Sequence, residues 1–502
     1  MSEKREKNLL QRSEKRNYGI ISLFVLVVLL WISPYSPIYR YITHTDLVCY
    51  KVMARGLLSG KIPYKDLFDH KGPLTYLVYA IGFLLPGNLN IGVWILCWII
   101  NCVGFIYAYK CNRLFFNEDT SLFATILILL VNTLTVFNIF LTGSMPDNLV
   151  LAPLMASTYL FLKETKEKDF SHIPDKSIFV IGLMCGLIFM TKLNICMFYL
   201  VFVGGYLLWL LTRKKIIVFL RDTGLFLLGI AVVCLPFLVF LGANHALSEF
   251  VDVYFRFNLN YGKDDLSINF WGSTSIPAPA KISMTILLLL SVMVIALKGK
   301  GMDLQRKIMT GLAVITFVVL SLPDNIVYFY IVFVPLYVLA FGVISEFLLA
   351  LVGEKTNAVQ LSAIVIVVQA IMLGMQTYLC GSIKLQKTEK ELALEAFSEA
   401  HPDATCMSFF KTTVIGYYDY CTGTPAFRVF YQPPIATDEL VQEQIDELAA
   451  RLPDTVVYIG VSDEAYDSQM CRFIEQNGYV LYGVFDEDYD AEYFYVREEF
   501  LV

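Results

Sequence analysis

The chemically most informative residues of this sequence lie in one stretch, HTDLVCYKVMARGLLSGKIPYKDLFDHKGPL, at positions 44–74. Its first acidic residue is Asp46, and His70 and Lys71 stand close to its end. A carboxylate can take the proton of an attacking hydroxyl as a general base, whereas lysine and histidine can bind the oxygens of a phosphate. The stretch therefore offers a base and a phosphate-binding group within one connecting segment.

Asp46 allows two interpretations. The residues that follow it separate Val48 and Val52 from Lys51 and Arg55, which predicts an amphipathic helix. In the first interpretation Asp46 is a general base at the start of that helix. In the second it caps the helix N-terminus, which stabilises the charged carboxylate and makes it a weaker base. Spacing alone does not separate the two.

A phosphate site and a simple turn compete for the end of the stretch. Lys71 and His70 could bind a phosphate, and Gly72 would let the backbone approach it. Alternatively, a solvated loop bends at Pro73 into a short helix over residues 74–85. This helix is expected to be interfacial or re-entrant, because 12 apolar residues are too few to cross a bilayer.

Two further charges interrupt apolar segments. Asp147, in TGSMPDNLVL, fits a helix N-terminus, where the helix dipole stabilises it, or a second acidic position that orients substrate or binds a divalent cation. Lys192, in GLIFMTKLN, separates two nearly continuous apolar segments. A lysine inside a membrane segment is a functional-site hypothesis, with snorkelling to the interface as the alternative. We favour a role for Lys192 as partner of an anionic lipid phosphate.

Four residues complete the candidate set. Arg256, in the long 242–281 loop, is a further candidate phosphate ligand. Tyr50, Asp69 and Tyr330 are candidates for binding the sugar or the acceptor. Tyrosines near the ends of apolar segments are also typical of an interfacial aromatic belt, which is the alternative for Tyr330.

The composition indicates that the elements that position these residues are transmembrane helices. Of the 502 residues 57% are apolar and 17% charged, and the mean hydropathy of +0.60 excludes a soluble globular class. Apolar runs long enough to cross a hydrocarbon core recur along the chain. They predict an α-helical polytopic membrane protein with about 11 transmembrane helices. The predicted spans are 18–38, 89–109, 120–140, 148–162, 177–191, 194–212, 220–241, 282–297, 308–322, 326–350 and 359–379.

Lysine and arginine placement predicts the orientation. Residues 1–17 are basic and should be a cytoplasmic N-terminus, so that 18–380 form the transmembrane domain and 381–502 lie outside the cell membrane. The 44–74 and 242–281 loops are then the basic exceptions on the outer side. Because basic outer loops oppose the usual charge bias, their cations are expected to have a function.

Residues 381–502 predict a small acidic α/β domain. They hold 23 Asp and Glu against 8 Lys and Arg, a net charge of −15, whereas the rest of the chain has 22 and 31, a net of +9. The acidic domain argues against a nucleic-acid partner. Helix-like TDELVQEQIDELAARL and the strand-like TVVYIGV, YVLYGVF and AEYFYVRE support the α/β assignment. We find no phosphate-binding loop or nucleophile elbow in it, and therefore expect an accessory role.

The ordered motifs resemble those of the GT-C superfamily of membrane glycosyltransferases. The layout is most similar to the branch with the dolichyl-phosphate-mannose–protein mannosyltransferases, the lipid A aminoarabinose transferases and their bacterial relatives. The residues that carry the resemblance span about 18–350; they are Thr45-Asp46, GLLSGKIPYKD, FDHKGPL, SMPDNLVL, GLIFMTKLN and YFYIVFVPLY.

The resemblance implies a bacterial-type plasma-membrane enzyme of the cell envelope that glycosylates an extracytoplasmic lipid, glycan or protein. It would move a hexosyl or pentosyl group from a polyprenyl-phosphate donor, with inversion. Asp46 would be the catalytic base and Asp147 the second acidic position, while Lys71 and Lys192 would contact the donor phosphate. Leu47 stands where the family often has another acidic residue, so no cofactor is assigned and a divalent cation stays only possible.

Two other classes compete with an enzyme. A transporter or lipid-linked-glycan flippase should show paired, Gly/Pro-broken spans and charges near the bilayer midplane. The sequence lacks internal symmetry, and its unusual charges gather near one predicted face. A scaffold protein with an outer binding domain would not need Asp46.

Overall fold

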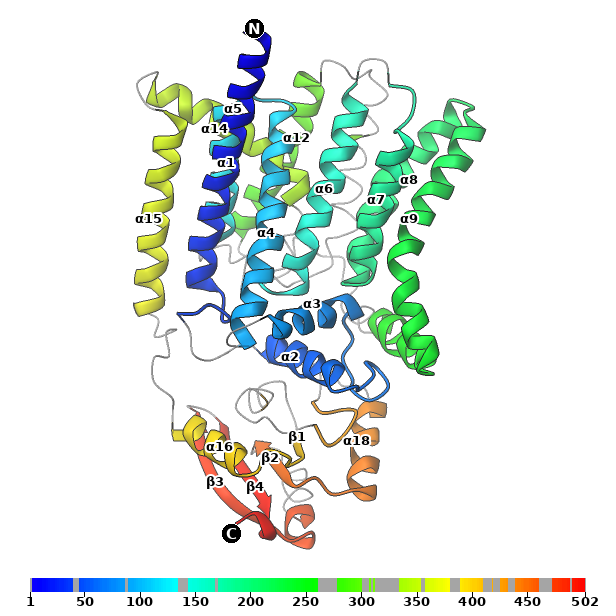
Figure 1. The fold of residues 1–502 in the computed structure, drawn as a ribbon, viewed down its shortest axis with the longest axis vertical. Helices are drawn as coiled ribbons and strands as arrows, with labels where there is room; N and C mark the ends of the chain where they lie inside the picture. The colour runs from blue at the N-terminus through cyan, green and yellow to red at the C-terminus, as the bar shows by residue number, and fades with distance from the viewer. Residues whose placement is uncertain are drawn as a thin grey trace.

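The computed structural model describes most of the chain. The described residues are 2–38, 45–85, 89–133, 143–167, 170–260, 278–299, 307, 310–311, 334–353, 357–379, 389–409, 418, 425–431, 438–459, 472–487 and 490–501. Long apolar helices make up one part, and a small sheet with its helices makes up the other (Figure 1).

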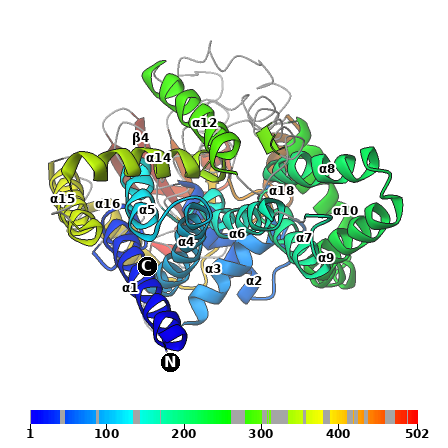
Figure 2. The same cartoon turned by 90° about the horizontal axis from the view of Figure 1, so that it is seen from above.

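The apolar helices run side by side in Figure 1. They are α1 (Ser2–Ile32), α4 (Leu89–Arg113), α5 (Glu118–Thr133), α6 (Pro146–Lys166), α7 (Asp175–Phe189), α8 (Met197–Thr212), α9 (Ile216–Ala243), α12 (Ala278–Lys298), α14 (Val334–Val352) and α15 (Ala358–Leu379). Seen from above, α15, α1, α4, α6, α7 and α9 follow one another, and each packs on the next (Figure 2).

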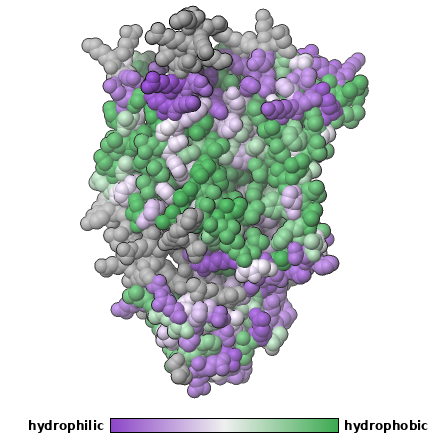
Figure 3. Space-filling view, viewed as in Figure 1, coloured by the Kyte–Doolittle hydropathy of each residue, from purple (hydrophilic) through white to green (hydrophobic). Residues whose placement is uncertain are grey.

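Six helices of the described residues are long and apolar enough to cross a membrane: Gln11–Ile32, Asn90–Arg113, Leu193–Thr212, Ile216–Ala243, Val334–Val352 and Ala358–Met375. Helix α9 exposes leucines such as Leu220 and Leu235, which suits contact with lipid. An apolar band crosses the face of this part of the molecule that Figure 3 shows. Each predicted span except 308–322 overlaps a helix, and that one lies almost wholly outside the described residues.

Two short helices lie across the ends of the apolar helices farthest from the N-terminus (Figure 1). They are α2 (Thr45–Leu58) and α3 (Pro73–Leu84), and they pack on each other. Proline at the first position of α3 is favoured because its missing N–H has no partner to lose. The prediction of a short helix after Gly72-Pro73 is confirmed.

Gly72 is needed here for a different reason from the one that the sequence indicated. Its N–H donates to the Thr191 carbonyl (3.0 Å), and a Cβ at this position would collide with the backbone of Met190. The N–H of Leu74 donates to the Met190 carbonyl at 2.8 Å. The close approach that glycine permits is therefore to the end of α7, and it fixes the start of α3 against that helix.

The C-terminal part contains a four-stranded mixed sheet. The strands β1 (Cys406–Phe409), β2 (Thr455–Ile459), β3 (Tyr479–Glu487) and β4 (Asp490–Arg497) have the order β1-β2-β4-β3, with β1 and β2 parallel and the other pairs antiparallel. Helices α16 (Glu389–Ala400) and α18 (Asp438–Ala450) flank it (Figure 1). This part lies against α2 and α3, opposite the apolar helices.

Candidate active site

The loop between α2 and α3 is held in place by its own backbone and by neighbouring elements. Tyr64 has a φ of 71°, a left-handed conformation that is unfavourable for a tyrosine. Its N–H donates to the Leu67 carbonyl (2.8 Å), and its hydroxyl donates to the Lys71 carbonyl (2.8 Å). Strained residues of this kind persist where surrounding contacts fix them. The loop thus presents its last residues in a defined conformation.

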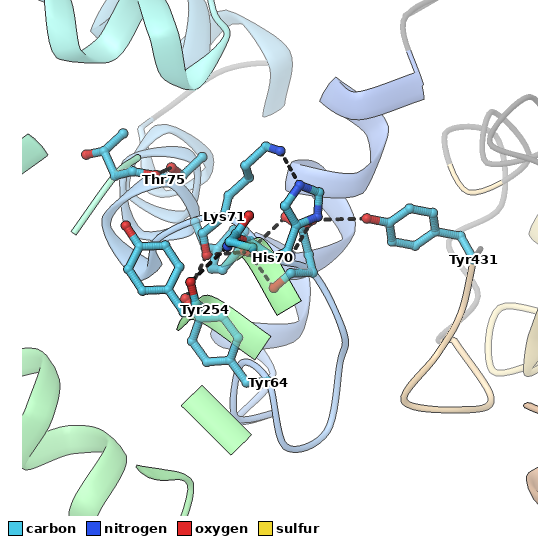
Figure 4. A network of polar contacts seen from close by, with 10 residues as sticks. Tyr64, His70, Lys71, Thr75, Tyr254 and Tyr431 are labelled. Atoms are coloured by element: carbon cyan, nitrogen blue, oxygen red, sulfur yellow. Dashed lines mark hydrogen bonds and ion pairs between the residues drawn. The ribbon is translucent and has the colours of Figure 1, made fainter. Parts of the chain in front are cut away.

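Asp69 is the centre of the first polar cluster. Its side chain is buried, and it accepts hydrogen bonds from the hydroxyl of Tyr76 (2.8 Å), the hydroxyl of Tyr431 (3.0 Å) and the backbone N–H of His70 (2.8 Å). Burial raises the pKa of the Asp69 carboxyl, while the charge of Lys71 and the two tyrosine hydroxyls oppose that rise. We call Asp69, His70, Lys71, Tyr76 and Tyr431 the Asp69 cluster (Figure 4).

His70 and Lys71 are in direct contact within this cluster. The ammonium group of Lys71 lies at hydrogen-bond distance from Nε2 of His70 (Figure 4). Because an ammonium group can only donate, Nε2 must accept, and the proton of a neutral imidazole is then on Nδ1. Nδ1 lies 3.5 Å from Oδ1 of Asp69. Burial, together with the charges of Lys71 and Lys192, lowers the pKa of His70 well below its usual value, which agrees with a neutral ring.

The second polar feature is an ion pair between Asp147 and Lys192. Nζ of Lys192 lies 2.7 Å from Oδ1 of Asp147, and the side chains are 10% and 3% exposed. Asp147 lies in the first turn of α6, and Lys192 directly precedes a short 3₁₀ helix after α7. Snorkelling of Lys192 is wrong as an interpretation, because its ammonium group is buried against a carboxylate. The backbone hydrogen bond from the Gly72 N–H to the Thr191 carbonyl brings the residue before Lys192 to the residue after Lys71, so the pair lies near the Asp69 cluster.

Asp46 lies in the first turn of α2, which begins at Thr45. It is therefore inside the helix and not at its cap position, and its side chain is partly exposed. Burial raises the pKa of Tyr431, and the negative charges of Asp69 and Asp46 add to that rise. Helix α2 packs on α3, which carries Tyr76, so Asp46 lies on an element that borders the Asp69 cluster.

Two predicted residues, Arg256 and Tyr50, do not join this arrangement. The guanidinium group of Arg256 is paired with Asp252 at 2.5 Å, and its side chain is 73% exposed. Tyr50 is fully buried, with its ring edge-on to that of Tyr79 at 5.8 Å. Tyr330 lies outside the described residues.

Sequence reasoning missed several residues that complete the site. Two residues beyond Arg256, Nδ2 of Asn258 donates to the His70 carbonyl at 2.7 Å. Tyr76 lies seven positions after Asp69, one helical turn into α3. Its closeness in sequence to Asp69 and the short YLVY pattern could have indicated it as a partner. Tyr431 had none, because it is separated from Asp69 by 362 positions. Only the docking of the C-terminal part brings Tyr431 to this place.

The described residues contain no group of three or more His, Cys, Asp or Glu side chains that could hold a metal ion. The candidate site contains three carboxylates (Asp46, Asp69 and Asp147), a neutral imidazole, two ammonium groups and several tyrosine hydroxyls. An ammonium group in contact with a neutral ring keeps its full charge for an anion, and a partly exposed carboxylate nearby can accept a proton.

Comparisons with known proteins agree with this architecture. The family model of dolichyl-phosphate-mannose-protein mannosyltransferases matches residues 70–241, beginning at His70 of the Asp69 cluster. No curated protein matches the chain.

Solved structures with a similar fold cover nearly the whole chain. ArnT from Cupriavidus metallidurans bound to undecaprenyl phosphate has a TM-score of 0.59 at 11% identity, over 95% of this chain and 98% of that one. Its apo form has a TM-score of 0.57, also at 11% identity, over 95% and 97%. The oligosaccharyltransferase AglB from Archaeoglobus fulgidus, in complex with an inhibitory peptide and a dolichol-phosphate, has a TM-score of 0.50 at 10% identity, over 95% and 74%. The likeness in fold to these solved structures covers nearly the whole chain and extends into the C-terminal part.

Proposed function

We propose that this chain, which has the fold of the GT-C membrane glycosyltransferases, transfers a sugar from a polyprenyl-phosphate donor to an extracytoplasmic acceptor. The observation that carries the proposal is the buried Asp69 cluster together with the Asp147–Lys192 pair, at the end of the apolar helices. His70, Lys71 and the Asp147–Lys192 pair lie within residues 70–241, which match the mannosyltransferase model. Both similar structures with a bound lipid contain a polyprenyl-type phosphate. A polyprenyl-phosphate donor suits this site, because its lipid chain can lie along the apolar helices while its phosphate approaches the ammonium groups of Lys71 and Lys192.

Lys71 is proposed as the residue that binds the donor phosphate. Its ammonium group donates to a neutral His70 ring, so one of its three N–H bonds is used and its charge is not cancelled by that contact. A phosphate gains charge-assisted hydrogen bonds from such a group. As the bond between the anomeric carbon and the phosphate oxygen breaks, negative charge grows on the leaving phosphate, and Lys71 stabilises it.

Lys192 is proposed to act beside Lys71, with Asp147 holding it in position. Their ion pair keeps a buried ammonium group next to His70 without leaving either charge unpaired. A phosphate that approaches His70 and Lys71 therefore meets the field of a second cation. In this proposal Asp147 orients Lys192 and takes no proton.

Asp46 is proposed as the general base. Its carboxylate takes the proton from the acceptor hydroxyl while the hydroxyl oxygen attacks the anomeric carbon from the side opposite the phosphate. One carbon–oxygen bond forms, another breaks, polyprenyl phosphate leaves, and the configuration inverts. The position of Asp46 in the first turn of α2, which packs on α3, supports its place near Asp69.

The proposal includes an orientation. Residues 1–17 are cytoplasmic, the site and residues 381–502 lie outside, and the membrane is a bacterial-type plasma membrane. The positive-inside bias of the sequence supports this placement. The separation of the N-terminus and the C-terminal part onto opposite ends of the helices is consistent with it (Figure 1).

A transfer assay tests the proposal. The purified full-length protein is incubated in lipid nanodiscs with a panel of labelled polyprenyl-phosphate sugars and candidate acceptors. We expect the wild type to release polyprenyl phosphate and label an acceptor, and Asp46→Asn to lose at least about 100-fold in rate. Equal rates for the two proteins would remove Asp46 as base. Movement of intact donor across a bilayer without transfer would instead indicate a flippase.

A further inference from the structure

One short segment of the C-terminal part, residues 425–431, is fastened to the loop between α2 and α3. The N–H of Phe68 donates to the Arg428 carbonyl (2.8 Å), and Nε of Arg428 donates to the Tyr64 carbonyl (2.7 Å). Nζ of Lys61 donates to the Pro425 carbonyl at 3.2 Å. The guanidinium group of Arg428 also bonds the Glu443 carboxylate of α18. These contacts join the C-terminal sheet and helices to the loop that ends at Lys71.

At its last residue this segment enters the Asp69 cluster. The hydroxyl of Tyr431 donates to Oδ1 of Asp69 at 3.0 Å, the same oxygen that accepts the His70 N–H and faces Nδ1 of the His70 ring. The ring of His70 accepts from Lys71 at its other nitrogen. A continuous series of polar contacts therefore runs from Tyr431 through Asp69 and His70 to Lys71 (Figure 4).

We propose that Tyr431 is a positioning residue that sets the orientation of the His70 ring and the Lys71 ammonium group through Asp69. The inference rests on the proposed function for the meaning of Lys71, but the contact series itself does not depend on it. The C-terminal part, which we expected to be accessory, then becomes a component of the phosphate-binding site.

The physical reason is the burial of the Asp69 carboxylate. A carboxylate away from water is stable only while its oxygens have donors, and Tyr76 and Tyr431 each supply one hydroxyl to a different oxygen. Without the Tyr431 hydroxyl, Oδ1 keeps the His70 N–H and must seek a replacement donor. The His70 ring can supply one, because its Nδ1 lies 3.5 Å from Oδ1, and a rotation of the ring toward Oδ1 would pull its other nitrogen away from Lys71.

The test compares two buried tyrosines, one whose hydroxyl donates to Asp69 and one whose hydroxyl does not. Tyr431→Phe removes the hydroxyl that reaches Asp69, and Tyr418→Phe removes a buried hydroxyl that donates to the Phe430 carbonyl (3.0 Å) in the same segment but does not reach Asp69. Each full-length variant is measured in nanodiscs for the affinity of undecaprenyl phosphate. The rate at which diethylpyrocarbonate modifies His70, read by mass spectrometry, is the second readout.

We expect Tyr431→Phe to weaken the binding of undecaprenyl phosphate about fivefold to tenfold and to change the His70 modification rate several-fold, because a hydrogen bond to a charged group is lost. Tyr418→Phe should leave both quantities within about twofold, even where its unfolding temperature falls equally. Equal effects of the two variants, or none from Tyr431→Phe, would overturn the proposal. If the wild type binds no undecaprenyl phosphate, the proposed function fails, and the His70 rate alone decides the role of Tyr431.

A second variant tests the link from its other end. In an Asp69→Asn background, Tyr431→Phe should cause less than about a twofold further loss of affinity, because the two residues act through one contact. Independent, multiplying losses would mean that Tyr431 acts by another route, which would overturn the proposal. This comparison also holds where Tyr431→Phe lowers stability, because both backgrounds carry the same tyrosine replacement.

Discussion

The two buried polar groups of the site stabilise their charges in opposite ways. In the Asp147–Lys192 pair, a carboxylate and an ammonium group neutralise each other at 2.7 Å. In the Asp69 cluster, the carboxylate is held by hydroxyl and amide donors, and the ammonium group of Lys71 contacts a neutral ring. In the pair, each charge is balanced by the opposite charge of its partner. In the cluster, the ammonium group of Lys71 contacts the His70 ring, which is neutral and does not balance its charge. The contrast predicts that breaking the pair mainly lowers stability, whereas changing Lys71 in the cluster mainly weakens ligand binding.

The largest effect should come from breaking the pair. Lys192→Met leaves Asp147 buried without its cation, and removal of one partner of a buried ion pair costs about 3–5 kcal/mol. The free energy of unfolding, measured in detergent, checks this. The double variant Asp147→Asn/Lys192→Gln should recover most of the loss, because no unpaired charge remains.

A matched surface pair provides the control. Lys298 and Glu346 are 2.6 Å apart but 33% and 53% exposed, so Lys298→Gln should cost no more than about 1 kcal/mol. If Lys192→Met lowers the free energy of unfolding by equally little, the Asp147–Lys192 pair does not stabilise the fold as proposed.

Replacement of Lys71 in the Asp69 cluster should affect stability less than Lys192→Met does, but it should clearly weaken the binding of undecaprenyl phosphate. Lys71→Gln removes the cation and keeps a polar side chain of similar length, so the affinity for undecaprenyl phosphate should fall about tenfold to 100-fold. The unfolding temperature should fall less than in Lys192→Met, because the Asp69 carboxylate keeps its hydroxyl and amide donors. Lys298→Gln, at the far end of α12, should bind as the wild type does. An unchanged affinity of Lys71→Gln for undecaprenyl phosphate would show that the Asp69 cluster does not bind the phosphate.

The smallest effect is a dependence of stability on pH. The pKa of His70 is lowered in the folded protein, so the unfolded chain binds the proton more readily below the ordinary value of 6.5. The stabilising effect of the neutral ring is present above pH 6.5 and is lost as the pH falls below it, by at most about 1.4 kcal/mol per pH unit.

His70→Gln is the reference for that measurement. Its unfolding free energy should decline less than that of the wild type between pH 7.5 and pH 5, when both are followed by tryptophan fluorescence. Parallel curves for the two proteins would show that His70 is not buried as a neutral ring.

The sequence predicts the charged residues of the site better than their partners. Asp147 and Lys192 each interrupt an apolar pattern, so both were found, but their pairing across 45 positions required the packing of α6 on α7. Gly72 was recognised as a close-approach position, yet its neighbour is the Met190 backbone. Tyr431 was missed because a tyrosine in a turn-rich segment has no periodicity that distinguishes it. The apolar helices were predictable since lipid imposes length and composition on them.

The most direct test of the central claim is a structure of the full-length protein with undecaprenyl phosphate in nanodiscs. The account predicts the phosphate at hydrogen-bond distance, about 3 Å, from Nζ of Lys71, with Asp147 and Lys192 still paired and Tyr431 still on Asp69. A phosphate bound away from α3, or one that displaces Asp147 from Lys192 while leaving Lys71 without contact, would contradict it.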